Sequence, residues 1–157
     1  MKLGQVCESR VVTTGPDTLL PQAALEMRRM QVGALVVVER RHGAAWPVGI
    51  LTDRDIAASL GAGADAVTRP VADVMSRRLV VATEQDDFFD GLTKMRRFGV
   101  RRLPIVNSEG SLRGIITLDD MIDVLSAKLR EAASVVPRER RVEARVVASA
   151  GRHDASY

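Results

Sequence analysis

Apolar residues recur three and four positions apart in two separate stretches of the chain, and this spacing predicts two amphipathic helices. They are Leu20, Ala23, Ala24, Met27 and Met30 in the first stretch, and Phe88, Phe89, Leu92, Met95 and Phe98 in the second. The turn-forming sequences TGPDT and TEQDD precede them. Each helix is therefore expected to begin just after its turn and to run for about three turns.

Each predicted helix is followed by two short runs that are rich in strand-forming residues. These are ALVVV (34–38) and VGIL (48–51) after the first helix, and RLPIV (102–106) and RGII (113–116) after the second. Polar and glycine-containing stretches, within 39–49 and 107–114, read as connections between the strands. A further apolar helical pattern follows Thr52 and Thr117. With a strand before the first helix, the unit is strand, helix, strand, strand, helix.

The two sets of elements are copies of one repeat. A shift of 68 residues places Met27, Arg28 and Arg29 on Met95, Arg96 and Arg97. Beyond the connection the shift is 65, and Thr52-x-x-Asp55 falls on Thr117-x-x-Asp120. A unit of about 60 residues buries its sheet poorly by itself. We therefore expect an α/β fold in which two pseudo-symmetric units pack sheet to sheet.

Composition narrows the class of protein. The chain has 157 residues and no apolar stretch near the roughly 20 needed to cross a bilayer, so a cytoplasmic protein without membrane contact is expected. Cys7 is the only cysteine, which rules out an intrachain disulfide and a cysteine metal cluster. His42 and His153 have no counterpart in the other copy, and no acid-base or nucleophile set is visible. We expect no catalytic residues, no metal site and no enzyme activity.

The positive charge is concentrated at the end of the chain. Net charge is +3, and residues 132–157 hold five arginines against three acidic residues. Only five aromatic residues are present, too few for a base-stacking platform, so binding of nucleic acid is disfavoured and stays a third hypothesis for the basic tail. The sequence leaves open whether this tail is disordered or contacts a partner.

The repeat resembles the cystathionine β-synthase (CBS) domain, and the pair resembles a tandem CBS, or Bateman, module. DVMS (73–76), VGALVVV (32–38), GVRRLPIV (99–106), GILTDRD (49–55) and GIITLDD (114–120) carry the resemblance. It implies CBS domains at 1–66 and 67–127, with a C-terminal basic extension at 128–157. It also implies clefts for adenosine-containing ligands, namely AMP, ADP, ATP, NAD or S-adenosylmethionine, and a homodimer.

Thr-x-x-Asp has two readings. It resembles a capping box, in which Thr52 caps the next helix and Asp55 reaches back to the threonine N–H, with Thr117 and Asp120 equivalent. A helix N-terminus also suits a phosphate, and an ionised aspartate can accept hydrogen bonds from ribose hydroxyls. The family resemblance implies these ligand roles for the threonine and the aspartate, and the two readings are compatible.

Other candidate residues differ between the copies. Arg101 and Arg102 of the second copy stand where the first has glycine and alanine, and the resemblance implies a phosphate role for Arg102. Arg54 is a further candidate for phosphate. The residues expected around adenine are Thr14, Gly15, Ala34, Val36 and Ile50 from the first copy, and Ala82, Thr83, Pro104 and Ile115 from the second.

The sequence thus predicts a regulatory module that senses a ligand, most plainly an adenine nucleotide linked to energy state, and signals to a separate effector protein. No cofactor is required by this reading. The alternative is a structural or interaction protein with empty clefts, in which Thr-x-x-Asp only caps helices.

Overall fold

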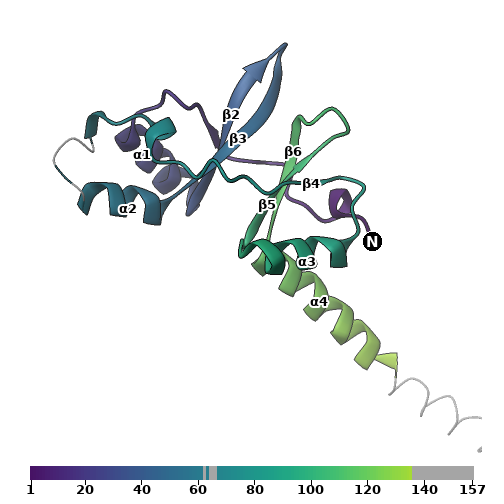
Figure 1. The fold of residues 1–157 in the computed structure, drawn as a ribbon. Coiled ribbons are helices and arrows are strands. Elements are labelled where there is room, and N and C mark those ends of the chain that lie inside the picture. Colours follow the sequence, from purple (N-terminus) through teal and green to yellow (C-terminus); the bar gives the residue numbers. More distant parts are fainter. Residues whose placement is uncertain (62, 64–66, 136–157) are drawn as a thin grey trace, which may run out of the picture. The chain divides into compact units, whose positions relative to one another are not determined.

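The computed structural model describes residues 1–61, 63 and 67–135, and within them it holds two mixed three-stranded sheets (Figure 1). The first repeat contains β1 (Thr13–Thr14), α1 (Leu20–Met30), β2 (Ala34–Arg41), β3 (Ala44–Thr52) and α2 (Asp53–Gly61). The second contains β4 (Ala82–Thr83), α3 (Phe88–Phe98), β5 (Arg102–Val106), β6 (Leu112–Thr117) and α4 (Leu118–Ala133). Both follow the predicted order, and the α/β class is confirmed.

The sheets repeat the same register. Their strand orders are β1-β2-β3 and β4-β5-β6, with one parallel and one antiparallel pair each. Ala34 pairs with Thr52 in the first, and Arg102 pairs with Thr117 in the second. Both antiparallel pairs carry an irregularity in register at equivalent positions, between Val37 and Val38 and between Ile105 and Val106. The two sheets meet through β3 and β6, which are in contact.

The connection predicted within 39–49 is wrong. Strand β2 continues to Arg41 and β3 begins at Ala44, so the turn between them consists of His42 and Gly43 (Figure 1). Both have positive φ, 50° and 82°, as in the two-residue turns that suit twisted hairpins. Pro47 did not break the strand because β3 lies at the edge of its sheet, where a missing N–H is tolerated.

The apolar positions of α1 pack on one face of the first sheet. Leu20, Ala23 and Met27 join β2, β3 and α2 residues in one buried cluster, and α1 and α2 are in contact. The cluster also contains Val71 and Met75, which belong to the second repeat by sequence. They come from its leader, residues 69–76, which includes the short 3₁₀ helix η3 (Val71–Asp73).

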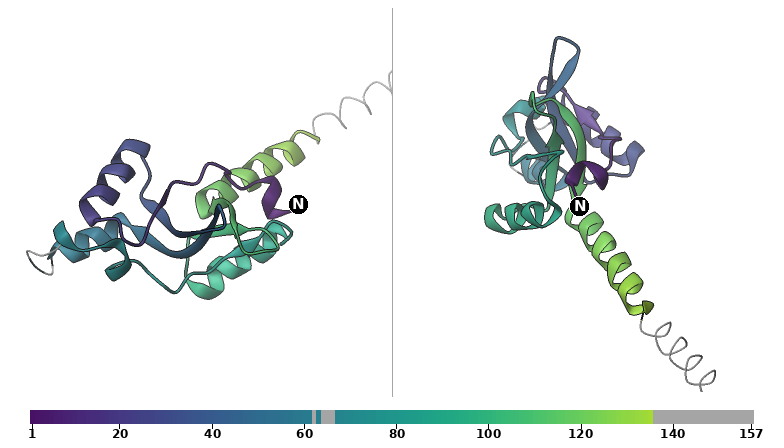
Figure 2. Two further views of the ribbon diagram at one scale, coloured as in Figure 1. Left: turned by 90° about the horizontal axis from the view of Figure 1, so that it is seen from above. Right: turned by 90° about the vertical axis from the view of Figure 1, so that its right-hand side faces the viewer.

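The leaders of the two repeats are exchanged. Backbone N–H groups of Val71 and Ala72 donate to the carbonyls of Thr18 and Pro16, at 2.8 Å each. In the same way Leu3 and Gly4 of η1 (Leu3–Gln5) donate to Asp86 and Glu84, at 2.9 and 3.0 Å. The N-terminal segment accordingly lies beside β4 and α3 (Figures 1 and 2). Each repeat is completed by a segment of the other.

Two glycines make this exchange possible. A Cβ on Gly49 of β3 would lie 2.6 Å from Met75 Sδ, and a Cβ on Gly114 of β6 would lie 2.7 Å from Cys7 Sγ. Both positions therefore need glycine because the other repeat's leader passes so close. Cys7 itself is half-buried. Burial raises the pKa of its thiol, which keeps it protonated at neutral pH.

Compact units divide the chain at Leu118: residues 1–118 hold both sheets, and a second unit begins at Asp119. Within α4, Asp119 and Asp120 lie in the first turn and Arg130 in the last, an arrangement that complements the helix dipole. The helix continues past the predicted boundary at 127 to Ala133. Residues 136–157, most of the predicted basic extension, lie outside the described residues, and so does His153.

Candidate functional site

Thr52 and Asp55 form a complete capping box at the start of α2. The Thr52 N–H donates to Asp55 Oδ2 at 2.8 Å, and the Asp55 N–H donates to Thr52 Oγ1 at 3.2 Å. The Thr52 hydroxyl also donates to Asp55 Oδ2, at 2.7 Å. The structural reading of this motif is therefore confirmed in the first repeat.

The backbone donors at this helix start are already occupied. The Asp53 N–H donates to the Gly33 carbonyl at 3.2 Å, and the Arg54 N–H donates to the Asp53 carboxylate at 2.8 Å. With the Asp55 N–H bound to Thr52, three donors that could have bound a phosphate have partners. In this arrangement, any phosphate near α2 depends on side chains.

Such side chains gather around a cleft of about 240 Å³ between the repeats. The first repeat contributes Ile50, Thr52 and Arg54. The second contributes two segments: the end of its leader, with Ser76, Arg78, Leu79 and Val80, and the start of β5, with Gly99, Val100, Arg101 and Arg102. Backbone bonds between Ile50 and Ser76, at 3.1 and 2.8 Å, hold the leader against β3. The cleft thus has an apolar part and an arginine-rich part.

Arg102 reaches across from the second repeat to the first. A Cβ on Gly33 would lie 3.7 Å from Arg102 Nη2 and 3.4 Å from Asp53 Oδ2. An added Cβ would thus be in ordinary van der Waals contact with both side chains, so the Arg102 guanidinium lies beside Gly33, whose counterpart in the second repeat is Arg101.

Five predicted residues lie together at the cleft: Ile50, Thr52, Arg54, Arg101 and Arg102. Asp55 is not among the described residues that line it, because its carboxylate faces Thr52. Thr14 and Gly15 line a separate hollow of about 540 Å³ with Glu39 and Arg40, on the β1 edge of the first sheet. Strand β2 separates them from β3, so they do not meet Ile50.

The remaining candidates lie in strands, apart from Asp120. Ala82 and Pro104 are buried, and Ala34 faces Thr52 across the β2–β3 pair. Ile115 exchanges two backbone hydrogen bonds with Glu8 of the first leader, both 2.9 Å. Thr117 ends β6, and Asp120 lies in the first turn of α4.

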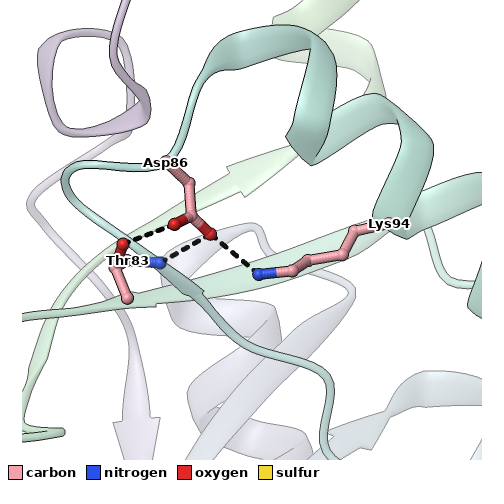
Figure 3. Close-up of polar contacts among 3 residues, drawn as sticks. All are labelled: Thr83, Asp86 and Lys94. Carbon is pink, nitrogen blue, oxygen red and sulfur yellow. Dashed lines mark hydrogen bonds and ion pairs between the residues drawn. The ribbon is translucent and has the colours of Figure 1, made fainter.

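Thr83 belongs to a polar cluster rather than to a wall for adenine (Figure 3). Asp86 accepts hydrogen bonds from the Thr83 hydroxyl at 2.6 Å and from its N–H at 3.2 Å, and Lys94 Nζ lies 2.7 Å from the same carboxylate. Burial alone would raise the pKa of Asp86, but Lys94 and the Thr83 groups outweigh it and lower that pKa below its usual value. The cluster fixes the turn from β4 to α3.

Sequence reasoning missed one arginine of the cleft, Arg78, and also the uncharged lining residues Ser76, Leu79, Val80, Gly99 and Val100. The Arg78 side chain enters the site because the second leader packs on the first repeat, an exchange that hydrophobic periodicity does not reveal. The neighbouring Arg77 takes no part in the cleft and donates to the Ala72 carbonyl at 3.0 Å. The adjacent arginines of SRRL differ in role only because one faces Ala72 and the other the cleft.

A larger hollow of about 600 Å³ lies along α3 and is lined by residues such as Phe89, Thr93 and Arg96. Its described lining comes from the second repeat and the first residue of α4, without a residue of the first repeat. It therefore lacks the pairing of groups from both copies that marks the smaller cleft, which we take as the candidate site.

Comparison with known families decides the class of the chain. The CBS domain family model matches residues 3–62 and 71–127. The chain belongs to the CBS domain family. This CBS domain pair is 40% identical over 114 residues to the CBS domain-containing protein YhcV of Bacillus subtilis. The alignment covers 72% of this chain and 77% of that protein. The chain is 32% identical to an uncharacterized protein of Methanopyrus kandleri, covering 79% of this chain but only 62% of that relative.

Solved structures share the fold. A CBS domain pair complexed with 5′-methylthioadenosine and S-adenosylmethionine superposes with a TM-score of 0.71 at 22% identity, covering 82% of this chain and 98% of that one. A CBS domain protein from Pyrobaculum aerophilum complexed with AMP gives 0.69 at 22% identity, covering 76% and 89%. Among the described residues of the CBS pair, no helix is long and apolar enough to cross a bilayer.

Proposed function

We propose that this CBS pair is a regulatory module that binds an adenosine-containing ligand in the cleft between its repeats and signals to a partner protein. The observation that carries the proposal is the composition of the cleft. Apolar Ile50 and Val100 and the cationic Arg102 come from different repeats and meet at one hollow. A nucleoside phosphate has the same division into an apolar base and an anionic end.

The solved relatives support the choice of ligand. The structures with AMP, and with 5′-methylthioadenosine and S-adenosylmethionine, share the fold and all contain adenosine in the ligand. The ligand-binding residues of this chain would be Ile50 and Val100 beside the base and Arg102 beside a phosphate. Thr52 stands at the cleft with its hydroxyl bound to Asp55, so the cap and the site share one residue.

Signalling would follow from the position of the cleft. A ligand that touches both repeats binds best in the arrangement that brings both sets of groups to it, so it shifts the population toward that arrangement. The shift is limited by the difference in affinity between arrangements. Within the proposal, a separate effector protein, and a second copy of the chain in a homodimer, would read that change.

One observation favours the alternative, a structural protein in which Thr-x-x-Asp serves only as a cap. The capping box of α2 is complete in the structure, and its N–H groups are satisfied by the protein itself. That reading accounts for Thr52 and Asp55. It leaves the arginines around the cleft without a role.

Thermal denaturation and calorimetry with AMP, ADP, ATP, NAD and S-adenosylmethionine test the proposal. At a ligand concentration 100 times Kd we expect stabilisation by about 2.7 kcal/mol. Arg102→Gln is expected to weaken binding, because it removes a cation from the cleft, while Arg77→Gln leaves it unchanged. If none of the five ligands stabilises the wild-type chain or gives binding heat, the structural alternative is correct.

A further inference from the structure

The cleft gathers arginines from three segments. Arg54 comes from the first turn of α2, Arg78 from the second leader, and Arg101 and Arg102 from the start of β5. Arg102 is half-buried and the other three are exposed, so they stand toward the mouth of the cleft. The apolar part of the cleft lies beside these arginines and consists of Ile50, Leu79, Val80 and Val100. The positive charge is greater than one phosphate group requires.

Ion pairs neutralise several arginines elsewhere in the described chain, but not three of the arginines at the cleft. Elsewhere in the described chain Arg29, Arg41 and Arg113 pair with glutamates at 3.2, 2.6 and 3.7 Å. Arg54, Arg78 and Arg102 form no ion pair within 4.0 Å among the residues that the structure describes. Asp55 is bound to Thr52, and the Asp53 carboxylate accepts from the Arg54 N–H. Like charges that converge in this way are stabilised by a polyanion.

We propose that Arg54 and Arg78 make this cleft selective for nucleotides that carry two or more phosphates, with Arg78 as the residue that distinguishes them from a monophosphate. The inference rests on the proposed function and specifies its ligand. Arg102, whose guanidinium lies beside Gly33 of the first repeat, would bind the phosphate next to the ribose. Arg54 and Arg78 are then available to the phosphates beyond it, with planar guanidinium groups that bind phosphate oxygens in pairs.

The repeat provides an internal comparison. By the shifts of 68 and 65, the counterparts of Arg78, Arg101 and Arg102 are Arg10, Gly33 and Ala34, and that of Arg54 is Asp119. Four arginines in one set of positions therefore correspond to one arginine and one aspartate in the other. Selectivity for a polyphosphate belongs to one of the two sets, so one nucleotide di- or triphosphate is expected per chain.

Calorimetric titrations test the inference. They are done in EDTA, which chelates divalent cations and so leaves the full negative charge on the phosphates. The ligands are ATP, ADP, AMP, adenosine, S-adenosylmethionine and inorganic tripolyphosphate. We expect ATP and ADP to bind at least about tenfold more tightly than AMP, with one site per chain, because each added charge-assisted hydrogen bond is worth about a factor of ten or more. Tripolyphosphate alone should bind, but more weakly than ATP.

Arg78→Gln is the decisive variant, and Arg77→Gln is its matched control, since it removes the same charge one residue away. Arg78→Gln should weaken the binding of ATP about tenfold and that of AMP less than about threefold. Arg78→Lys should retain part of the affinity for ATP. Arg77→Gln should leave the affinity for both ligands unchanged. Unchanged circular dichroism and melting temperature show that each variant is folded.

The two proposals fail in different ways. If AMP or S-adenosylmethionine binds as tightly as ATP, or if Arg77→Gln weakens ATP as much as Arg78→Gln does, the polyphosphate inference is wrong while the adenosine site stands. If no adenosine compound binds better than tripolyphosphate, the proposed function itself is wrong.

Discussion

Asp55 and Asp86 both lie three residues after a threonine, and each accepts hydrogen bonds from that threonine's hydroxyl and N–H. The consequence differs because the two aspartates stand at different distances from the next helix. Asp55 lies in the first turn of α2 and closes a helix cap, whereas Asp86 lies before α3 and also binds Lys94 (Figure 3). One spacing therefore serves a helix end in one place and a turn in the other.

Replacing Asp86 by asparagine should lower the free energy of unfolding by about 1 to 2 kcal/mol at pH 7, because a charged hydrogen-bond acceptor is lost. The pKa of Asp86 is lowered in the folded protein, so its stabilisation is present above the ordinary carboxyl pKa of about 3.9 and is lost as pH falls through the lower folded value. Urea unfolding at pH 7 and at pH 3 measures this.

The difference between wild type and Asp86→Asn should shrink at pH 3. Asp73→Asn, at an exposed carboxylate of η3, is the control and should change little at either pH. An equal loss at both pH values would show that the ionised form of Asp86 is not what stabilises the turn.

At this scale the sequence predicted the cap but not all of the cleft. The capping box is a local pattern, so Thr52 and Asp55 could be predicted from spacing alone. Arg102 could be identified because it breaks the repeat. Arg78 could not, since its place depends on the second leader packing on the first repeat. The sequence also did not reveal that Thr14 and Gly15 lie across the sheet from β3, which follows from the order β1-β2-β3.

Among the elements, the β2–β3 hairpin departs most from expectation. Its strands extend past the predicted connection, and this extension carries Trp46, the only tryptophan of the chain. A Cβ on Gly110, in the turn between β5 and β6, would lie 2.8 Å from Trp46 Cζ3. The longer hairpin of the first repeat therefore covers the turn of the second.

Gly110→Ala should change the fluorescence of Trp46, because the added methyl group displaces the indole ring. Gly43→Ala is a matched control: Gly43 also has positive φ, 82° against 91° at Gly110, but no atom lies within 4 Å of its added Cβ. In both variants the free energy of unfolding should fall by about 1 kcal/mol because of backbone strain, but only Gly110→Ala should shift the fluorescence emission. A similar shift in both would show that the ring does not rest on Gly110.

Over the whole molecule, the fold class and the repeat could be predicted because each unit's apolar periods survive in its own sequence. The exchange of leaders could not be predicted, because Val71 and Leu3 are similar apolar residues and each could equally have packed on its own repeat. Both are fully buried in the structure. Folding of each repeat therefore depends on a residue that belongs to the other.

Val71→Ala should lower the free energy of unfolding by about 2 kcal/mol, because a buried methyl-bearing side chain is lost from the cluster of the first repeat. The loss should appear equally in far-UV circular dichroism and in Trp46 fluorescence, which should follow one cooperative urea transition. Val67→Ala, at a valine that is 56% exposed just before the leader, should have little effect. Two separate transitions would show that the repeats fold independently.

The paired glycines constrain how the duplicated halves can diverge. Gly49 admits Met75, and Gly114 admits Cys7, so each leader is matched to a residue inherited by the opposite half. A Cβ at either glycine would also lie 2.9 Å from a backbone carbonyl of the facing leader, that of Ser76 or of Glu8, so a smaller leader side chain does not make room for it. Descendants of this chain can therefore alter the arginines of one half and leave the other without them, while the glycine at each junction between the halves must be kept.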